Sequence, residues 1–191
     1  MENAEHTRQM RHDLRHQLTA IQAMAGTENP KLTEYISTLI QNIPTAVKKY
    51  CENPTVSAVV SHYAAHCQSE GIDFSAWLMV PAQNPGMPDS AFCVIFANLL
   101  ENALEACRRM DGGAKFIRLN SSLEYGVLTI TMDNSFNGKA IVRDGNFYSS
   151  KRADAPGIGL PSIRTVSKAY QGDARFEAKG SIFQSSVYVK L

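Results

Sequence analysis

Residues 98–107 read NLLENALEAC and form the centre of a predicted helix over residues 91–110. Its apolar residues cover a broad face, as expected of a helix packed in a core. Asn98 and Asn102 stand four residues apart, so their side chains project from one side of that helix. Asparagine is a poor helix former because its amide competes with the backbone for hydrogen bonds. The pair therefore indicates a task for the two side chains, with exposed or capping asparagines as the alternative.

A second informative segment is Gly157-Ile158-Gly159-Leu160, which opens a predicted helix over 160–170. Glycines let the backbone approach a ligand closely, and free N–H groups at a helix start favour phosphate. Residues 134–156 before it are polar and without periodicity. A stretch of that length is too long for an ordinary connection and is typical of a lid or binding loop. Alone, the Gly157–Leu160 segment could equally be a plain loop-to-helix turn.

The rest of residues 54–191 supplies one further helix and several strands. A helix is predicted over 55–69, an apolar run over 72–80 suits a strand, and two alternating runs at 115–121 and 123–132 resemble a strand pair. Strands near 174–179 and 182–190 complete this domain. Three helices against a largely antiparallel sheet make an α+β two-layer sandwich.

Residues 1–53 form a different domain. Two apolar stripes with spacings of three and four predict two helices joined by a turn, a helical hairpin. One hairpin has too little partner surface for both stripes, so pairing with a second copy into a four-helix bundle is the simplest solution. The stripe residues are Met10, Leu14, Leu18, Ile21 and Met24, then Leu32, Tyr35, Ile36, Leu39, Ile40 and Ile43.

Composition narrows the function classes. The 191 residues carry a formal net charge of +1, which gives no electrostatic reason to expect nucleic acid or an anionic membrane as partner. The four cysteines form no C-x-x-C pair, so neither a zinc cage nor a redox motif is indicated. No apolar run approaches the roughly 18–20 residues needed to cross a bilayer. We expect a cytoplasmic chain, with membrane attachment only through a sensor region outside it.

The two motifs together resemble the ATPase superfamily of DNA gyrase, MutL and the histidine kinases, called GHKL. NLLENALEAC looks like its N-box, and GIGL, with Gly157, Gly159 and Leu160, looks like its second glycine box. The resemblance covers residues 54–191 and implies a Bergerat-type ATP-binding fold. It assigns to Asn102 a Mg²⁺ that bridges the ATP phosphates, and places Asn98 in the same pocket. Hydrolysing branches have a glutamate where Asn98 stands, so phosphoryl transfer is favoured over hydrolysis.

The first glycine box departs from the usual D-x-G-x-G pattern, because this chain has Asp133-Asn134-Ser135-Phe136-Asn137-Gly138. Strand parity places Asn134 on the face of Leu128, Ile130 and Met132. The amide oxygen of Asn134 can accept from the adenine amino group, and Asp133 is the alternative. Within the lid, Lys151 resembles the lysine that reaches the γ-phosphate, with a solvated lysine as the alternative.

Residues 11–18, RHDLRHQL, resemble the phosphoacceptor motif H-D-x-x-(N/H) of the quorum-sensing-like kinase branch. His12 would be the nucleophile, and Asp13 would accept the other ring proton and orient the imidazole. His16 could assist phosphatase chemistry or simply pack, and His12 with His16 could instead bind a metal. His62 and His66 repeat the i, i+4 spacing, which we interpret as structural.

The resemblance as a whole implies a dimeric sensor histidine kinase core that binds ATP and Mg²⁺. It would autophosphorylate a histidine and relay the phosphoryl group to the receiver domain of a response regulator. The alternatives are an ATPase switch of the same fold, which Asn98 disfavours, and a nucleotide-binding module without kinase activity.

Overall fold

The computed structural model describes residues 14, 17–22, 30–42, 48–84, 86–139, 142–143, 146–147 and 158–191. The chain divides into two compact units, residues 1–48 and 49–191. The sequence-based boundary between residues 53 and 54 therefore falls inside the second unit as the structure has it.

The first unit is helical where it is described. Residues 17–22 are helical, and α2 spans Pro30–Asn42. The side chain of Gln22 donates to the Ser37 hydroxyl at 2.7 Å, which links the two segments. Helix α2 ends at Asn42, and residues 48–50 are not helical. Pairing of this unit with a second copy stays a prediction.

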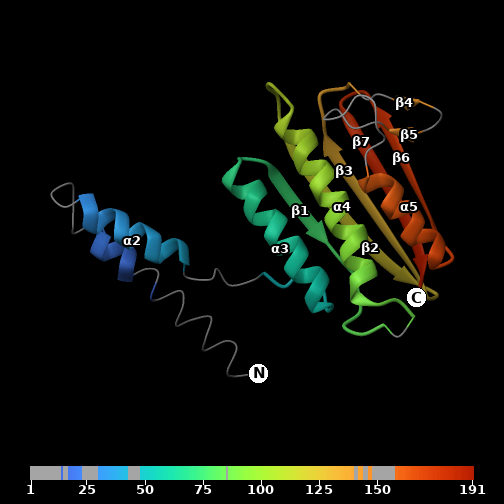
Figure 1. Cartoon of the computed structure of the whole chain (residues 1–191), viewed down its shortest axis with the longest axis horizontal. Helices are drawn as coiled ribbons and strands as arrows, with labels where there is room; N and C mark the ends of the chain where they lie inside the picture. The colour runs from blue at the N-terminus through green and yellow to red at the C-terminus, as the bar shows by residue number, and fades with distance from the viewer. Residues whose placement is uncertain are drawn as a thin grey trace. The chain divides into compact units, whose positions relative to one another are not determined.

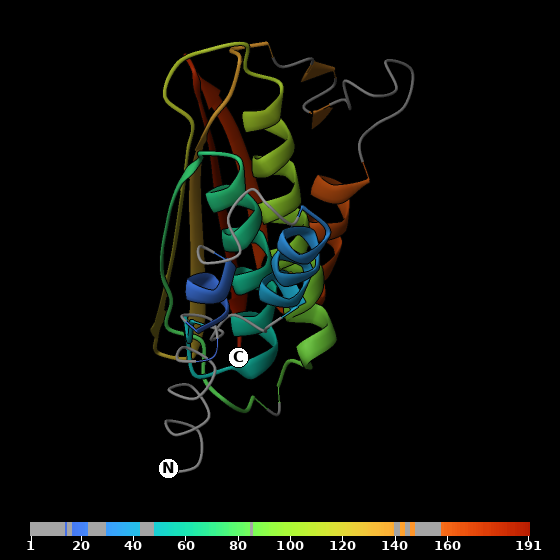
Figure 2. The ribbon, with the colours of Figure 1, turned by 90° about the vertical axis from the view of Figure 1, so that its left-hand side faces the viewer.

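The second unit is a two-layer α+β sandwich, as predicted. Helices α3, α4 and α5 lie side by side and cover one face of a five-stranded sheet (Figure 1), and the quarter-turned view separates the two layers (Figure 2). Its elements are α3 (Pro54–Ser69), β1 (Asp73–Trp77), α4 (Asp89–Arg108), β2 (Phe116–Glu124), β3 (Val127–Ser135), the short pair β4 (Val142–Arg143) and β5 (Asn146–Phe147), α5 (Gly159–Ala169), β6 (Asp173–Lys179) and β7 (Ile182–Lys190).

The order of the main sheet is β1-β2-β3-β7-β6. β1 pairs with β2 in parallel, and the other neighbours are antiparallel. Side chains alternate between the two faces of each strand, so one face contributes a row of fully buried apolar residues to the core. On β3 that row is Leu128, Ile130 and Met132, and their burial confirms the predicted period of two.

Helix α4 is the central helix of the core. Nine of its residues are buried, among them Phe92, Phe96 and Leu100. By length and composition alone α4 could cross a membrane, with a mean hydropathy of 1.3 in its most apolar stretch. Half of that stretch is buried inside the structure. Burial against the sheet and the other helices accounts for its apolar composition, and the weak membrane signal is that of a core helix.

Asn53 joins the start of α3 to the rest of the second unit. It is fully buried, its backbone N–H donates to the Val80 carbonyl at 3.1 Å, and its side-chain oxygen caps α3 by accepting from the Val56 N–H at 2.9 Å. Such caps contribute about 1 kcal/mol to stability. These bonds hold Asn53 to the second unit.

Asp89 holds the start of α4 against α3. The residue at the cap position of α4 is Pro88, and no side chain caps this helix. The Asp89 carboxylate instead accepts from Asn53 Nδ2 at 2.9 Å and from Thr55 Oγ1 at 2.7 Å. These two bonds hold the pKa of Asp89 below its ordinary value.

The hairpin between β2 and β3 turns later than predicted. The sequence suggested a break near residue 122, whereas both strands continue to a turn at Tyr125 and Gly126. Both turn residues have positive φ, 50° for Tyr125 and 76° for Gly126. This conformation suits glycine but is unusual for tyrosine. Tyr125 carries no common turn signal, so the sequence did not mark the position.

Candidate nucleotide-binding site

The asparagine pair lies half-buried on α4, among the buried apolar residues of that helix. Asn98 Nδ2 donates to the Val94 carbonyl one turn earlier, at 2.6 Å. This bond fixes the orientation of the Asn98 amide, and the amide oxygen lies toward Gly159. Asn102 Nδ2 is buried and has no hydrogen-bond partner among the described residues. A buried polar group without a partner is costly, so the Asn102 amide has hydrogen-bonding capacity that the described residues leave unused.

Gly159 lies directly against the two asparagines. A Cβ atom added to Gly159 would come within 3.0 Å of both Asn98 Oδ1 and Asn102 Nδ2. Only a residue without a side chain fits there comfortably. The structure thus brings together Asn98, Asn102 and Gly159, which lie about 60 residues apart in the sequence, as one contiguous group.

The first turn of α5 completes this group. No side chain caps the N-terminus of α5, and the cap residue Ile158 is exposed. The early N–H groups of a helix have no partner within it and carry the positive end of its dipole. Leu160, half-buried, packs against the core and fixes the direction of the helix. Pro161 has no N–H, so the donors that the first turn presents beside the asparagine pair are the N–H groups of Gly159 and Leu160. This arrangement suits an anion such as phosphate.

Asn134 and Asp133 lie on opposite faces of β3. Asn134 is 1% exposed and continues the buried row of Leu128, Ile130 and Met132, as strand parity predicts. Its amide nitrogen donates to the Ser135 carbonyl at 2.9 Å, which leaves the oxygen to accept.

The side chain of Asp133 accepts from Gln184 Nε2 at 3.3 Å, and Gln184 is its neighbour across the β3–β7 ladder. Consecutive residues of a strand point to opposite faces of the sheet. Asp133 therefore points away from the helix layer that carries the asparagine pair. We drop it as the alternative to Asn134.

A buried bridge that the sequence did not reveal ties α4 to the end of β3. Cys107 Sγ lies 3.4 Å from Ser135 Oγ and 3.5 Å from the Ser135 carbonyl, and Ser135 Oγ accepts from the Phe116 N–H at 2.9 Å. Burial raises the pKa of the Cys107 thiol, so the thiol stays protonated and can donate. The bridge fixes the strand end next to Asn134. No local pattern in the sequence predicts that Cys107 contacts the hydroxyl and carbonyl of Ser135.

Phe136 anchors the chain where it leaves β3. It is 6% exposed, its N–H donates to the Ser181 carbonyl at 2.9 Å, and its ring packs edge-on against Phe183 at 6.1 Å. The polar stretch after β3 therefore begins from a fixed point. In the sequence, the only sign that Phe136 anchors the chain is that it is an aromatic residue among polar neighbours.

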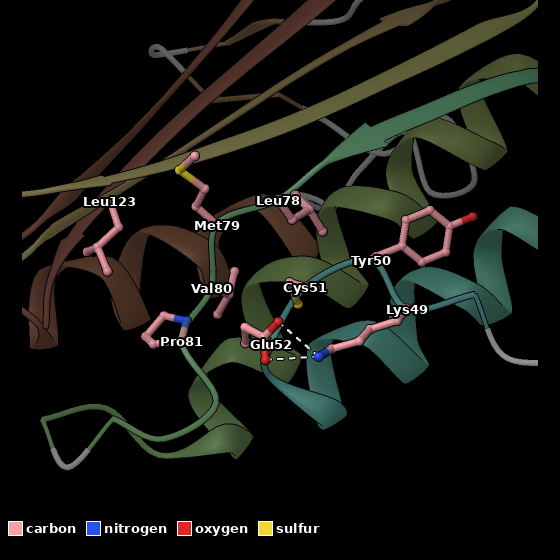
Figure 3. Close-up of a pocket in the computed structure, with 9 residues that line it drawn as sticks. All are labelled: Lys49, Tyr50, Cys51, Glu52, Leu78, Met79, Val80, Pro81 and Leu123. Carbon is pink, nitrogen blue, oxygen red and sulfur yellow. Dashed lines mark hydrogen bonds and ion pairs between the residues drawn. The ribbon is translucent and has the colours of Figure 1, made fainter. Parts of the chain in front are cut away.

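A pocket of about 510 Å³ lies elsewhere in the second unit. Its lining is Lys49, Tyr50, Cys51, Glu52, Leu78, Met79, Val80, Pro81 and Leu123 (Figure 3). The charged residues Lys49 and Glu52 of this lining form an ion pair with each other at 2.9 Å (Figure 3). None of the asparagine-pair residues lines it. The pocket offers no converging polar groups, so we do not assign it to a nucleotide.

The donor set at the asparagine pair fits Mg²⁺ together with a nucleotide. Mg²⁺ prefers oxygen ligands and often binds through few protein groups plus substrate phosphates. Within the described ranges no group of three or more His, Cys, Asp or Glu side chains could hold a metal alone. The Asn102 amide can supply an oxygen by a flip that exchanges its two terminal atoms. Phosphate oxygens could then pair with the α5 N–H groups and share the same ion.

Several predicted site residues lie outside the described residues. These are His12 and Asp13 of the phosphoacceptor motif, Lys151 of the lid and Gly157 of the second glycine segment. Their roles stay predictions. Asn98, Asn102, Asn134, Gly159 and Leu160 are described, and of these the structure places the first two against Gly159.

The family model described as the GHKL domain matches residues 87–190, more than half of the 191 residues. The chain belongs to the GHKL domain family. The match spans α4, the whole of β3 and the start of α5, so it contains every described residue of the candidate site. A search of curated proteins finds no match.

Solved structures that are similar to this GHKL chain include histidine kinase domains. The catalytic domain of histidine kinase ThkA, in a nucleotide-free form, has a TM-score of 0.53 at 17% identity, covering 71% of this chain and 89% of that one. The histidine kinase domain of the Erythrobacter litoralis EL346 blue-light activated kinase has a TM-score of 0.53 at 15% identity, covering 100% and 95%. The mycobacterial sensor histidine kinase MprB gives 0.50 at 13% identity, covering 70% and 94%. At identities of 13–17%, this similarity establishes a shared fold only.

We expect Gly159→Ala to weaken Mg-ATP binding about tenfold or more, because small displacements at a positioned site carry large costs. The added methyl group would push the Asn98 and Asn102 amides from their positions. Stability should be unchanged or slightly higher, since alanine suits a helix better than glycine. Isothermal titration calorimetry measures the affinity, and urea denaturation measures the stability.

Gly112→Ala is the matched control, because Gly112 has open space around it and needs no positive φ. Its nucleotide affinity should equal that of the wild type. If Gly159→Ala binds Mg-ATP as tightly as Gly112→Ala, the contact with the asparagine pair does not shape the site.

Proposed function

We propose that this GHKL chain binds Mg-ATP between α4 and the first turn of α5 and transfers the γ-phosphoryl group to a histidine. The observation that carries the proposal is the contact of Gly159 with Asn98 and Asn102. It joins an oxygen ligand for a hard cation to a helix start that suits phosphate. The histidine kinase fold of the solved relatives supports the transfer to histidine.

Each residue of the site has a proposed task. The Asn102 amide oxygen faces the metal, and the N–H groups of the first turn of α5 hold phosphate oxygens. Asn134 Oδ1 accepts from the adenine amino group, because its amide nitrogen already donates to the Ser135 carbonyl. Lys151 reaches the γ-phosphate from the lid. Mg²⁺, when bound, neutralises charge that develops on the phosphates.

The nucleophile in this proposal is His12. A neutral imidazole nitrogen forms a bond to the γ-phosphorus while the bond from that phosphorus to the bridging oxygen of ADP breaks. Asp13 accepts a hydrogen bond from the other ring nitrogen and takes up the positive charge by pairing with it. Catalysis then consists mainly of positioning and charge neutralisation, which the asparagine pair and the α5 start can supply.

Hydrolysis is the less favoured reaction for this site. Asn98 cannot take a proton from water, and its amide nitrogen is bonded to the Val94 carbonyl. Glu101, the glutamate adjacent in sequence, accepts from the Tyr63 hydroxyl of α3 at 2.7 Å. That carboxylate is therefore held on the α3 side of α4. A base for water is missing where hydrolysing relatives are expected to have one.

The proposed partners are a second copy of this chain and the receiver domain of a response regulator, and the proposed location is the cytoplasm. Support for dimerisation comes from apolar side chains of the first unit that its own helices leave exposed. These are Leu14, Ile21, Leu32 and Tyr35, each between 41% and 62% exposed.

Light scattering should find the full chain as a dimer at tens of micromolar. Ile21→Glu should shift it toward monomer, because a charge would be placed in the apolar contact between copies. Trp77→Glu is a suitable control, since Trp77 is also exposed, at 72%, but lies in the second unit. A wild-type monomer, or equal loss of dimer in both variants, would contradict the bundle.

Incubation with γ-labelled ATP should give a label that is labile in acid and stable in base, as expected of phosphohistidine. His12→Gln should lose all label yet keep its affinity for Mg-ATP, because the nucleophile is not part of the nucleotide pocket. Asp13→Asn should be phosphorylated more slowly, since it weakens the orientation of the imidazole.

The site of labelling separates the alternatives. Phosphopeptide mapping should place the label on His12. Label on His16, or label that persists in His12→Gln, would show a different acceptor. Tight Mg-ATP binding with no label at all would point to a nucleotide-binding module, and release of labelled phosphate without labelled protein would point to an ATPase.

A further inference from the structure

Two histidines of α3 lie side by side on the surface of the second unit. His62 and His66 are both exposed, and their ring centroids are 4.7 Å apart with an interplanar angle of 74°. They are one helical turn apart, where side chains of a helix meet. The interpretation of the pair as structural, made from the sequence, stays a prediction. Neither side chain belongs to the buried core, whose α3 members include Val56, Val60 and Cys67.

The groups around this pair are already bound to other partners. His62 packs edge-on against the Tyr63 ring at 5.2 Å, but the Tyr63 hydroxyl donates to Glu101. Glu70, one turn after His66, accepts from Arg108 through both of its oxygens at 2.5 and 2.9 Å. In the part of the chain that the structure describes, no side chain accepts from or donates to either imidazole. The four ring nitrogens are available to a ligand from solvent.

We propose that His62 and His66 together bind one divalent transition-metal ion of the Cu²⁺, Ni²⁺ and Zn²⁺ class. Imidazole suits these ions, and Cu²⁺ should bind most tightly of them. Two ring nitrogens on adjacent turns of a rigid helix can reach one ion at the roughly 2.0–2.1 Å typical of zinc–imidazole bonds. The described residues offer no third His, Cys, Asp or Glu ligand here, so water fills the remaining positions.

This site is chemically distinct from the proposed nucleotide site. Mg²⁺ is a hard cation that takes oxygen ligands, and two imidazoles do not select it. The inference goes beyond the proposed kinase function and does not rest on it. Because α3 is fully formed in the folded unit and not in an unfolded chain, metal binding should also stabilise the protein against heat.

Titration of the nucleotide-free full chain with CuCl₂ tests the proposal by calorimetry, with an excess of Mg²⁺ present. The other histidines of the chain are His6, His12 and His16, and His12 and His16 share the same spacing. A reference protein with His6→Gln, His12→Gln and His16→Gln removes that background. It should bind one equivalent of Cu²⁺ and melt at a higher temperature when loaded.

In the reference protein, His62→Gln and His66→Gln should each weaken Cu²⁺ binding by at least roughly 10- to 100-fold. Losses of that size follow even from mutation of groups that only orient a metal ligand, and these changes remove a ligand itself. Both should also lose the thermal shift. Because the two side chains are exposed, circular dichroism of the metal-free variants should match the reference.

A matched control moves the second imidazole without changing the number of histidines. His66→Gln combined with Ser69→His places the rings seven residues apart, about 10 Å along the helix, which is too far for one ion. This variant should bind as weakly as His66→Gln. Full affinity in it, or full affinity in His66→Gln alone, would overturn the two-histidine site.

Discussion

Asn102→Ala should abolish measurable Mg-ATP binding, with a loss of affinity of at least about 100-fold. The change removes the proposed oxygen ligand of the metal and a side chain that lies against Gly159 at the start of α5. Mg²⁺ in such a site shares its ligands with the phosphates, so the loss of one protein oxygen weakens metal and nucleotide together. Calorimetry with Mg-ATP measures the effect.

The same variant should keep its fold. Asn102 Nδ2 has no hydrogen-bond partner among the described residues, so alanine breaks no bond and removes an unsatisfied group. We expect the free energy of unfolding to change by less than about 1 kcal/mol, or to rise. Asn120→Ala serves as a control, because Asn120 is an exposed asparagine of β2. Equal Mg-ATP affinity in the two variants would remove Asn102 from the metal site.

Gly172→Ala should destabilise the second unit by more than about 3 kcal/mol, beyond the usual range for overpacking. A Cβ atom on Gly172 would lie 1.8 Å from the Tyr188 carbonyl oxygen and 2.9 Å from the Val189 Cα. Both are backbone atoms of β7 and cannot rotate away. The turn is further fixed because the Gly172 N–H donates to the Ser167 carbonyl at 2.9 Å.

Urea denaturation of the full chain gives the measurement for Gly172→Ala. Gly112→Ala again provides the control, and its free energy of unfolding should stay within about 0.5 kcal/mol of the wild type. A loss smaller than about 1 kcal/mol in Gly172→Ala would mean that the α5–β6 connection can move away from β7. Local packing around Gly172 would then be looser than the structure indicates.

The helices of the second unit could be predicted closely because their signals are local. Apolar periodicity located α3, α4 and α5 to within about two residues of their bounds. The strand order β1-β2-β3-β7-β6 could not be predicted, since it depends on pairing between segments far apart in the sequence. The turn at Tyr125 and the hydrogen bonds of Asp89 could not be predicted for related reasons. A tyrosine gives no turn signal, and Asn53, a partner of Asp89, lies far from it in the sequence.

The candidate site also contains residues that local patterns predict and residues that they do not. Helical spacing identified Asn98 and Asn102, and strand parity chose the buried Asn134 over Asp133. Contacts between segments far apart in the sequence could not be predicted. The bridge between Cys107 and Ser135 joins α4 to a strand end 28 residues later, and nothing in the sequence near either residue specifies it. Local patterns predict the candidate ligand-binding residues. They mostly do not predict the residues, such as Cys107 and Ser135, that hold those residues in place.

The place of β7 in the sheet also determines the order in which a growing chain can fold. β7 is synthesised after every other element described, yet it lies between β3 and β6. Until residues 182–190 leave the ribosome, β3 has a free edge beside the apolar residues Leu128, Ile130 and Met132. Unpaired edges next to apolar surface promote aggregation of nascent chains. Synthesis of residues 182–190 is therefore the step that pairs β3 with β7 and β7 with β6 and completes the five-stranded sheet.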